Sequence, residues 1–291
     1  MKTANYQWQQ ILSDLTIGNS CAPRGMPVRE LMSYQSVINM QHPLVTVAER
    51  RLNYRFAAAE AYWILTGDNR LAPLVQHIKK FRDFSDDGET LSGAYGPQVV
   101  DQMRYVISTL QTDNDSRQAV MTLWRPRPQP SRDIPCTVAL QFLVRDGRIH
   151  CVATMRSSDA WLGWPYDVFS FTMISTMVGL KLIHGNVRFP KLELGRLYMN
   201  VGSQHVYCDN PPLQLRNICR NSVNYEEYHD MTLYGLISPD HLLQCLRYVS
   251  EYPEYKLNHS EVPTFFKEMV GLILLRKEGK KNELVTANES T

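Results

Sequence analysis

The chain has 291 residues, of which 44% are hydrophobic, and a formal net charge of +2. This length and apolar content allow a sizeable buried core, in one large domain or two small ones. The basic residues form no sustained stripe, so direct binding to nucleic acid is not expected. No apolar run reaches the roughly 18 residues of a membrane helix, and the N-terminus has no signal-peptide pattern. We therefore expect a cytoplasmic protein with no membrane partner.

The cysteines show no CxxC pair and no spacing typical of metal ligands. A chain of this length does not need disulfides to be stable, so free thiols, most of them buried, and no metal are expected. The six positions are Cys21, Cys136, Cys151, Cys208, Cys219 and Cys245.

The first half of the chain alternates between helix and loop patterns. Residues 5–15 form an amphipathic pattern that predicts a helix, and residues 21–40 read as a polar loop followed by a strand. Apolar positions over residues 47–68 predict a long helix that ends at Gly67. A turn-rich loop over residues 82–96 then leads to a helix over residues 97–111.

The second half is richer in strands. A strand over residues 117–124 precedes a proline-rich surface loop, and two further strands meet at Asp146-Gly147, a strong hairpin signal. Residues 168–185 predict an apolar helix, residues 187–207 contain more strand, and residues 239–275 look helical.

Strands and long helices without strict alternation predict the α+β class. We expect a single large domain, residues 1–275, built on a mixed β-sheet with long helices packed on one side. The polar residues 276–291 are expected to be a disordered tail.

Two side chains stand out for their surroundings. Cys136 directly follows a proline and precedes a strand-like apolar run, so it is either a small core residue or a nucleophile. Glu60 lies between Ala59 and Ala61 on an apolar helix face, where an unpaired carboxylate is rarely buried. It is either a functional group or the partner of an arginine in a core salt bridge.

Five segments, in matching order and spacing, resemble the thymidylate synthase family from about residue 20 to residue 220. They are EAYWILTGDNR (60–70), SRQAVMTLW (116–124), IPCTVALQFLV (134–144), MRSSDAWLGWPYDVFSF (155–171) and GSQHVY (202–207). The resemblance implies a thymidylate synthase-like fold, a homodimer, a pyrimidine nucleoside monophosphate as substrate and 5,10-methylenetetrahydrofolate as co-substrate.

The resemblance also implies roles for individual residues. Cys136 is the expected nucleophile. Glu60 is expected to position an ordered water molecule and to transfer protons, and Asp167 is expected to hydrogen-bond to the base and so select it. The expected substrate-binding residues are Arg24, Arg117, Gln141, Arg156, Ser157, Ser158, Asp167, His205 and Tyr207, with Arg117 reaching the partner subunit's site. The expected folate-binding residues are Phe81, Phe84, Asp159, Leu162, Gly163 and Tyr166, and Tyr95 is a weaker candidate there.

Some of these residues have simpler interpretations. His205 and Tyr207 lie two apart on a strand and face the same side, so they either reach the ribose or only pack. Asp159 is also a plausible turn residue, and Asp167 is a plausible N-cap of a helix that begins at Val168. Gly163 is expected to let the backbone approach a ligand closely.

The chemistry explains why a cysteine is needed. Carbon C5 of a pyrimidine is a poor nucleophile, and addition of a thiolate at C6 makes it reactive. Arg156, twenty residues after Cys136, is expected to lower the pKa of the thiol and to bind the phosphate. C5 then takes up a one-carbon unit, which hydride converts to a methyl group and water converts to a hydroxymethyl group. The first outcome requires that water be excluded.

The base-reading position departs from the synthases. Where they carry the asparagine of LPFN, this chain has Asp167 in WPYD. An amide donates to O4 of uracil and accepts from N3–H, whereas a carboxylate accepts from the 4-amino group of cytosine. In this respect the chain resembles the cytidylate hydroxymethylases of bacteriophages and antibiotic pathways, which implies bacterial or phage-infected host cytoplasm.

Other departures point the same way. The loop PRGMPVREL (23–31) looks like the hydroxymethylase version, FRDF (81–84) replaces a tryptophan-rich loop, and the apolar C-terminal tail that closes the synthase site has no match. We therefore expect (d)CMP hydroxymethylation, with dCMP favoured and CMP possible. Gln118 and Thr137 also differ from the synthases, with effects that the sequence does not define.

Two other functions stay open at this point. One is a methylase acting on dCMP or dUMP by the same covalent chemistry. The other is a catalytically idle nucleotide- or RNA-binding regulator, against which the intact set of Cys136, Arg156 and Glu60 argues.

Overall fold

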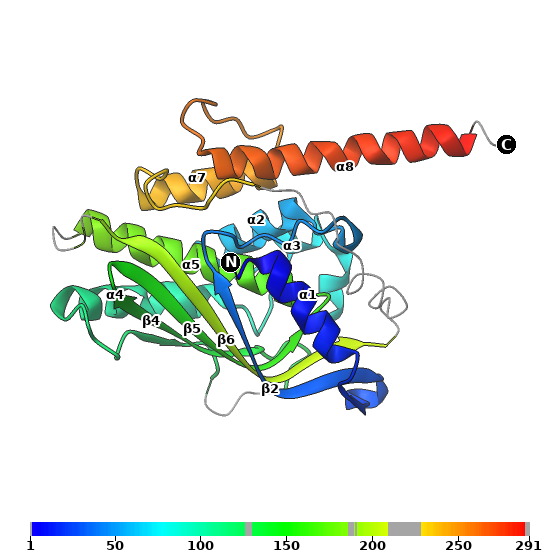
Figure 1. The fold of residues 1–291 in the computed structure, drawn as a ribbon, viewed down its shortest axis with the longest axis horizontal. Helices are drawn as coiled ribbons and strands as arrows, with labels where there is room; N and C mark the ends of the chain where they lie inside the picture. Colours follow the sequence, from blue (N-terminus) through cyan, green and yellow to red (C-terminus); the bar gives the residue numbers. More distant parts are fainter. Residues whose placement is uncertain (1, 126–129, 186–188, 190, 209–227, 289–291) are drawn as a thin grey trace.

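Within residues 2–125, 130–185, 189, 191–208 and 228–288, which the computed structural model describes, six strands form one sheet (Figure 1). Their order is β1-β2-β6-β5-β4-β3. The strands are β1 (Asn19–Cys21), β2 (Val28–Asn39), β3 (Val120–Thr122), β4 (Thr137–Arg145), β5 (Arg148–Asp159) and β6 (Glu193–Tyr207).

The sheet is mixed because one pair of strands is parallel. β5 and β6 run parallel, and every other neighbouring pair is antiparallel. A parallel pair requires a long crossover, and here the crossover contains the 22-residue helix α5 (Trp164–Gly185). The prediction of an α+β fold on a mixed sheet is confirmed.

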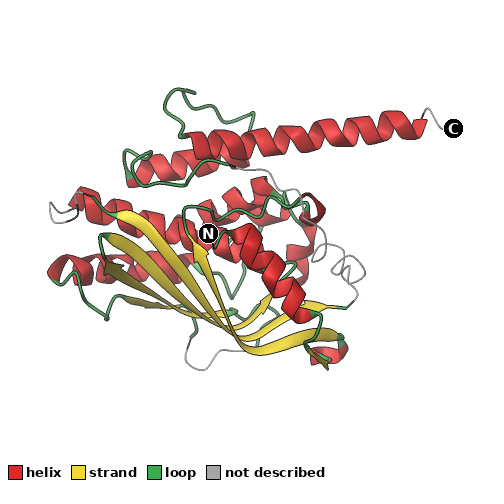
Figure 2. Cartoon of the chain, viewed as in Figure 1, coloured by secondary structure: helices red, strands yellow, loops and turns green. Residues whose placement is uncertain are grey.

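The helices gather on one side of the sheet, as Figure 2 shows. α2 packs against α5, α4 and α7, while α8 packs against α7 and α2. Besides α5, the helices are α1 (Ala4–Leu15), α2 (Tyr54–Leu65), α3 (Ala72–Val75), α4 (Gly96–Thr112), α7 (Pro239–Ser250) and α8 (Thr264–Asn288), with short 3₁₀ turns at Pro23–Gly25 (η1), Ala48–Arg50 (η2) and Lys79–Asp83 (η3).

The predicted hairpin is present. β4 and β5 are joined by Asp146 and Gly147, with φ angles of 51° and 69°. Consecutive positive φ angles are the signature of the two-residue turns that match the twist of the flanking strands. The turn fixes the register of β5, the strand that carries Arg156.

Three predicted boundaries are wrong. The predicted helix over residues 47–68 is interrupted, because Arg51 takes a left-handed conformation and the Asn53 side chain caps α2 by accepting from the Phe56 amide. Helix α5 begins at Trp164, four residues before the predicted start at Val168. The strand predicted over residues 117–124 is shortened to Val120–Thr122.

The C-terminal region also differs from the expectation. α8 continues through Asn288, so a helix occupies most of the segment predicted to be a disordered tail (Figure 1). The polar composition of that segment is compatible with a helix as well as with disorder, because lysine and glutamate have good helix propensity. The domain boundary at residue 275 stays a prediction.

Helix α5 forms the centre of the core. By length and composition it is the one helix in the described part of the chain that could cross a membrane. From the sequence, no run of apolar residues long enough for this is expected. Most of it is buried between the sheet and the other helices, as expected for the core helix of a folded domain.

Truncation of a core side chain on α5 tests this packing. Phe171→Ala is expected to lower the free energy of unfolding by about 3–5 kcal/mol, because Phe171 is fully buried and its removal leaves a cavity. Lys181→Ala, on an exposed position of the same helix, should change it by less than about 0.5 kcal/mol. Urea denaturation measures both, and equal effects would contradict the central position of α5.

Candidate active site

A cavity of about 160 Å³ brings together the three predicted catalytic residues, Cys136, Glu60 and Asp167. They come from three different elements: the loop before β4, helix α2 and the first turn of α5. The remaining lining residues are Trp63, Ile64, Leu74, Phe81, Leu91, Gly93, Ala94, Tyr95, Asp133, Ile134, Pro135 and Ser170.

Cys136 directly precedes β4 and lies beside Arg156 and Ser157 of β5. The Ser157 hydroxyl lies 3.6 Å from its sulfur and donates to it. The Arg156 guanidinium donates to the carbonyl oxygens of Pro135 and Ile134, at 2.9 and 3.0 Å, and to the Ser157 hydroxyl at 3.1 Å. Arg156 therefore fixes the peptide just before the nucleophile while its side chain stays exposed.

The expected lowering of the thiol pKa is wrong for this arrangement. Burial raises the pKa of Cys136 and is the largest effect, and the nearby acids Asp167 and Asp133 act in the same direction. The Arg156 guanidinium and the Ser157 hydroxyl lower it, but they do not outweigh burial. The thiol therefore keeps its proton until the surroundings change.

Asp167 is not an N-cap. Its backbone N–H donates to the Gly163 carbonyl, so it lies inside the first turn of α5 rather than before it. Its side chain lines the cavity. Burial raises the pKa of Asp167 well above the usual range, and the acids Glu60 and Asp159 raise it further. The protonated form is therefore favoured.

Glu60 faces the same cavity from α2. The Ser170 hydroxyl of α5 donates to its Oε2 atom at 3.4 Å, and Glu60 forms no ion pair with any described residue. A core salt bridge to an arginine is thus not the reason for its position. Burial raises the pKa of Glu60 to about 7, so this group exchanges its proton near neutrality.

A second cluster of predicted residues lies on β5 and β6. The parallel register pairs Ser158 with Gln204 and Asp159 with His205. The His205 and Tyr207 rings lie 5.4 Å apart, and the exposed Arg24 donates to the Tyr207 hydroxyl at 3.4 Å. Of the predicted phosphate and sugar ligands, the fold thus joins Arg24, His205 and Tyr207, which come from distant parts of the chain.

Two predicted substrate ligands lie close together: Gln141 on β4, which pairs with both β3 and β5, and Arg117 just before the edge strand β3. The Gln141 amide donates to the backbone oxygen of Arg117 at 2.7 Å, and neither residue lines the cavity. Gln141 therefore holds the segment that carries Arg117. The Arg117 side chain is exposed.

Asp159 organises the turn between β5 and α5. Its Oδ1 atom accepts from the amides of Trp161 and Leu162, at 2.8 and 2.9 Å. Its Oδ2 atom is buried and has no hydrogen-bond partner within the described part of the chain. A buried acceptor without a donor is costly, so this oxygen fits a ligand with N–H groups, such as a pterin ring.

The other predicted folate residues surround this turn. Tyr166 is buried and contacts Phe56 edge-on, with 4.8 Å between the ring centres. The centre of the Phe81 ring lies 5.4 Å from that of Phe56. Leu162 and Phe84 are large apolar side chains that remain 41% and 39% exposed, respectively. Together with the unpartnered Asp159 oxygen, this partly open aromatic surface fits a folate.

Gly163 lies in that turn close to Asp167. A Cβ atom at this position would lie 3.6 Å from Oδ2 of Asp167, which is ordinary contact distance. The site therefore does not require glycine here for backbone strain.

The sequence interpretation missed two cavity residues. Ser170, which donates to Glu60, carries no signal because hydroxyls are common in helices. Asp133 resembles an ordinary loop charge, although its position three residues before Cys136 was a clue. Tyr95, the weaker folate candidate, lines the cavity together with Cys136 and Phe81, and its hydroxyl contacts the Thr137 amide and hydroxyl, at 3.3 and 3.0 Å.

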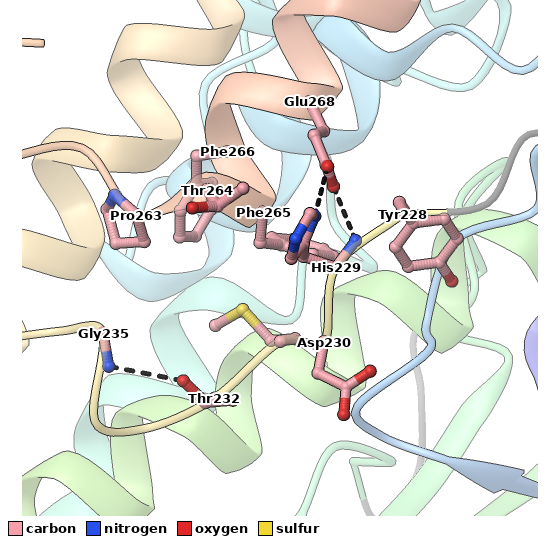
Figure 3. A pocket seen from close by; sticks show the side chains of 11 residues that line it. Tyr228, His229, Asp230, Thr232, Gly235, Pro263, Thr264, Phe265, Phe266 and Glu268 are labelled. Atoms are coloured by element: carbon pink, nitrogen blue, oxygen red, sulfur yellow. Dashed lines mark hydrogen bonds and ion pairs between the residues drawn. The ribbon is translucent and has the colours of Figure 1, made fainter.

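A larger and more open hollow, of about 740 Å³, lies between residues 228–235 and the start of α8 (Figure 3). There the Glu268 carboxylate accepts from the backbone amide of His229 and pairs with its ring (Figure 3). None of the predicted catalytic residues lines this hollow. The smaller cavity, where the chemically reactive groups converge, is therefore the candidate active site.

The cysteines are less buried than predicted. Among the five in the described residues, Cys151 and Cys245 are buried, whereas Cys21, Cys136 and Cys208 are half-buried, and Cys219 lies outside the described residues. No group of three or more His, Cys, Asp or Glu side chains within the described ranges could hold a metal ion.

Comparison with known families assigns the chain. Residues 7–267 match the family model described as thymidylate synthase. The chain belongs to the thymidylate synthase family. Membership implies a transferase that uses methylenetetrahydrofolate to transfer a one-carbon unit to a pyrimidine nucleotide, in agreement with a cavity lined by Cys136, Glu60 and Asp167.

Removal of the Glu60 charge should change how stability depends on pH. Because the folded-state pKa of Glu60 is raised from 4.5 to about 7, the folded state binds its proton more tightly, and stability falls as pH rises between these values. From pH 5 to pH 8 this fall is about 2–3 kcal/mol in the wild type. Glu60→Gln should lack it.

Urea denaturation at the two pH values measures the difference. Glu49→Gln, at an exposed glutamate, serves as the matched control and should keep the wild-type pH dependence. If the free energy of unfolding of Glu60→Gln depends on pH as it does in the wild type, Glu60 is ionised and solvated in the folded protein.

Proposed function

We propose that this protein transfers a one-carbon unit from methylenetetrahydrofolate to C5 of a cytidine 5′-monophosphate, with dCMP favoured, and adds water to give the 5-hydroxymethyl nucleotide. The observation that carries the proposal is the buried carboxyl of Asp167, which lines one small cavity together with Cys136 and Glu60. The family supplies the reaction class, and Asp167 supplies the choice of base.

The protonation state of Asp167 suits cytosine. In the protonated form its O–H donates to N3 and its carbonyl oxygen accepts from the 4-amino group, so both positions of the cytosine edge are paired. If the proton passes to N3 as sulfur adds to C6, the same contacts become a charge-assisted pair, which is stronger. A protonated carboxyl also pairs with N3–H and O4 of uracil, so the preference for cytosine arises in the charge-assisted state, in which ionised Asp167 accepts from N3–H and the 4-amino group but would repel O4 of uracil.

Cys136 is the nucleophile in this proposal. Its raised pKa means that thiolate formation must be coupled to substrate binding. Protonation of Asp167 removes one of the negative charges that oppose the thiolate, while Arg156 remains close enough to favour it. The exposed guanidinium of Arg156 and the cluster of Arg24, His205 and Tyr207 are then available for the phosphate and the sugar.

Glu60 moves protons in the proposed reaction. A carboxyl with a pKa of about 7 both accepts and donates protons near neutrality, as removal of the C5 proton and exchange at the 4-amino edge require. The Ser170 hydroxyl keeps it directed at the cavity. The methylenetetrahydrofolate supplies a carbon at the oxidation level of formaldehyde, and Asp159 and the aromatic residues of the turn are proposed to bind it.

We further propose a cytoplasmic homodimer in which Arg117 reaches the partner's phosphate site. Its exposure at the edge of the sheet supports this position. Methylation is the second candidate product, since the same covalent steps precede both outcomes.

The product identifies the reaction directly. Incubation with methylenetetrahydrofolate and each of dCMP, CMP and dUMP, followed by mass spectrometry, is expected to show a hydroxymethyl group on dCMP and release of tetrahydrofolate. Cys136→Ala should abolish turnover, and Cys151→Ala, at a buried cysteine away from the cavity, is the control. A methyl product with dihydrofolate would reject hydroxymethylation.

Exchange of the base-reading carboxyl should change the preferred base. Asp167→Asn is expected to lower the ratio of dCMP to dUMP turnover by about 10- to 100-fold, the effect of one mispaired buried hydrogen bond of about 1–3 kcal/mol. The measurement is kcat/KM for both nucleotides. Wild-type turnover of dUMP alone, or a ratio that Asp167→Asn leaves unchanged, would defeat the role of Asp167.

A further inference from the structure

A third carboxyl, that of Asp133, lines the active-site cavity without an assigned role. It lies on the loop that leads to the nucleophile, and its Oδ2 atom accepts from the Gly93 amide at 2.7 Å. Within the described ranges the Asp133 side chain accepts a hydrogen bond at Oδ2 and none at Oδ1. One oxygen is thus anchored and the other is available to a small polar molecule in the cavity.

The surrounding loop holds Asp133 in place. Its own amide donates to the Ser131 hydroxyl at 2.9 Å, and Asp86 accepts from both Ser131 and Arg132. The contact with Gly93 is tight, since a Cβ atom there would lie 2.9 Å from Oδ1 of Asp133. A side chain held by contacts of this kind can orient a reactant.

The three cavity acids differ in their contacts. Asp167 is engaged by the base in the proposed function, and Glu60 accepts from the Ser170 hydroxyl. Burial raises the pKa of Asp133, the Gly93 amide opposes this effect and the charge of Asp86 adds to it. Asp133 is near enough to Cys136 for its charge to act on the thiol. With one oxygen held by Gly93 and the other without a partner among the described residues, Asp133 is the cavity acid that remains to act on a water molecule.

We propose that Asp133 is the general base that takes a proton from the water molecule added in the hydroxymethylation step. This inference rests on the proposed function and assigns the residue that makes water, rather than hydride, the reactant. Because Asp133 belongs to the same loop as Cys136, the base and the nucleophile are positioned together.

In the proposed step, water adds to the exocyclic methylene group of the covalent intermediate. The covalent intermediate carries sulfur on C6 and a methylene group double-bonded to C5. The water oxygen bonds to the methylene carbon while one proton passes to the Asp133 carboxylate. The electrons of the exocyclic double bond form C5=C6, and the C6–S bond breaks to return Cys136 as a thiolate. One water is consumed, and no oxidant or reductant is needed.

Asp133→Asn separates this step from those before it. With [5-³H]dCMP, tritium release reports formation of the exocyclic methylene, and mass spectrometry reports the hydroxymethyl product. The variant is expected to form that product about 100-fold more slowly, the usual size of a general-base effect. Added 2-mercaptoethanol should then trap the methylene as a thioether, raising the ratio of thioether to hydroxymethyl product.

Two controls distinguish this role from a structural one. Thiol-dependent loss of bromide from 5-bromo-dCMP requires Cys136 but no folate, and in Asp133→Asn it should be retained or faster than in wild type, because loss of the Asp133 charge favours the Cys136 thiolate. Asp86→Asn loosens the same loop but keeps the Asp133 carboxyl, so its ratio of hydroxymethyl product to tritium released should match wild type.

The two proposals fail in different ways. An unchanged ratio of hydroxymethyl product to tritium in Asp133→Asn, or the same loss in Asp86→Asn, overturns the role of Asp133 while hydroxymethylation stands. A methyl product from the wild-type protein rejects hydroxymethylation itself, and the role of Asp133 with it.

Discussion

The structure depends on one electrostatic constraint: a thiol and several carboxyls share a cavity too small and too buried for all of them to be charged. Burial raises the pKa values of Cys136, Glu60 and Asp167 together, and each negative charge opposes the next. Charges in such surroundings are tolerated only when they are paired or solvated. The protonated forms of these three groups are therefore favoured.

The fold supplies the means to keep these groups together. The parallel pairing of β5 and β6 places Asp159 next to His205, and the short turn after β5 begins the helix that carries Asp167. α2 brings Glu60 against α5, where Ser170 contacts it. Because α5 is buried along most of its length, small shifts of Asp167 are resisted by the packing of the core.

The C-terminal helix contributes to the same support. The Arg276 guanidinium donates to the Leu52 carbonyl and lies 4.6 Å from the centre of the Tyr54 ring, at the start of α2. This contact joins α8 to the helix that carries Glu60, far from it in sequence. Helix α8 thus packs on the helical layer and contacts α2 (Figure 1).

The sequence by itself determined the α+β class, the hairpin at Asp146-Gly147 and the family motifs that single out Cys136, Glu60 and Asp167, since these depend on local patterns and spacing. Only the tertiary structure decided which groups share the cavity. It added Asp133 and Ser170, placed Tyr95 in the same cavity as Cys136, and gave a half-buried thiol whose pKa is raised where the sequence predicted a lowered one. The physical reason is that burial and the distances between charges arise from contacts across the fold, which no local sequence pattern records.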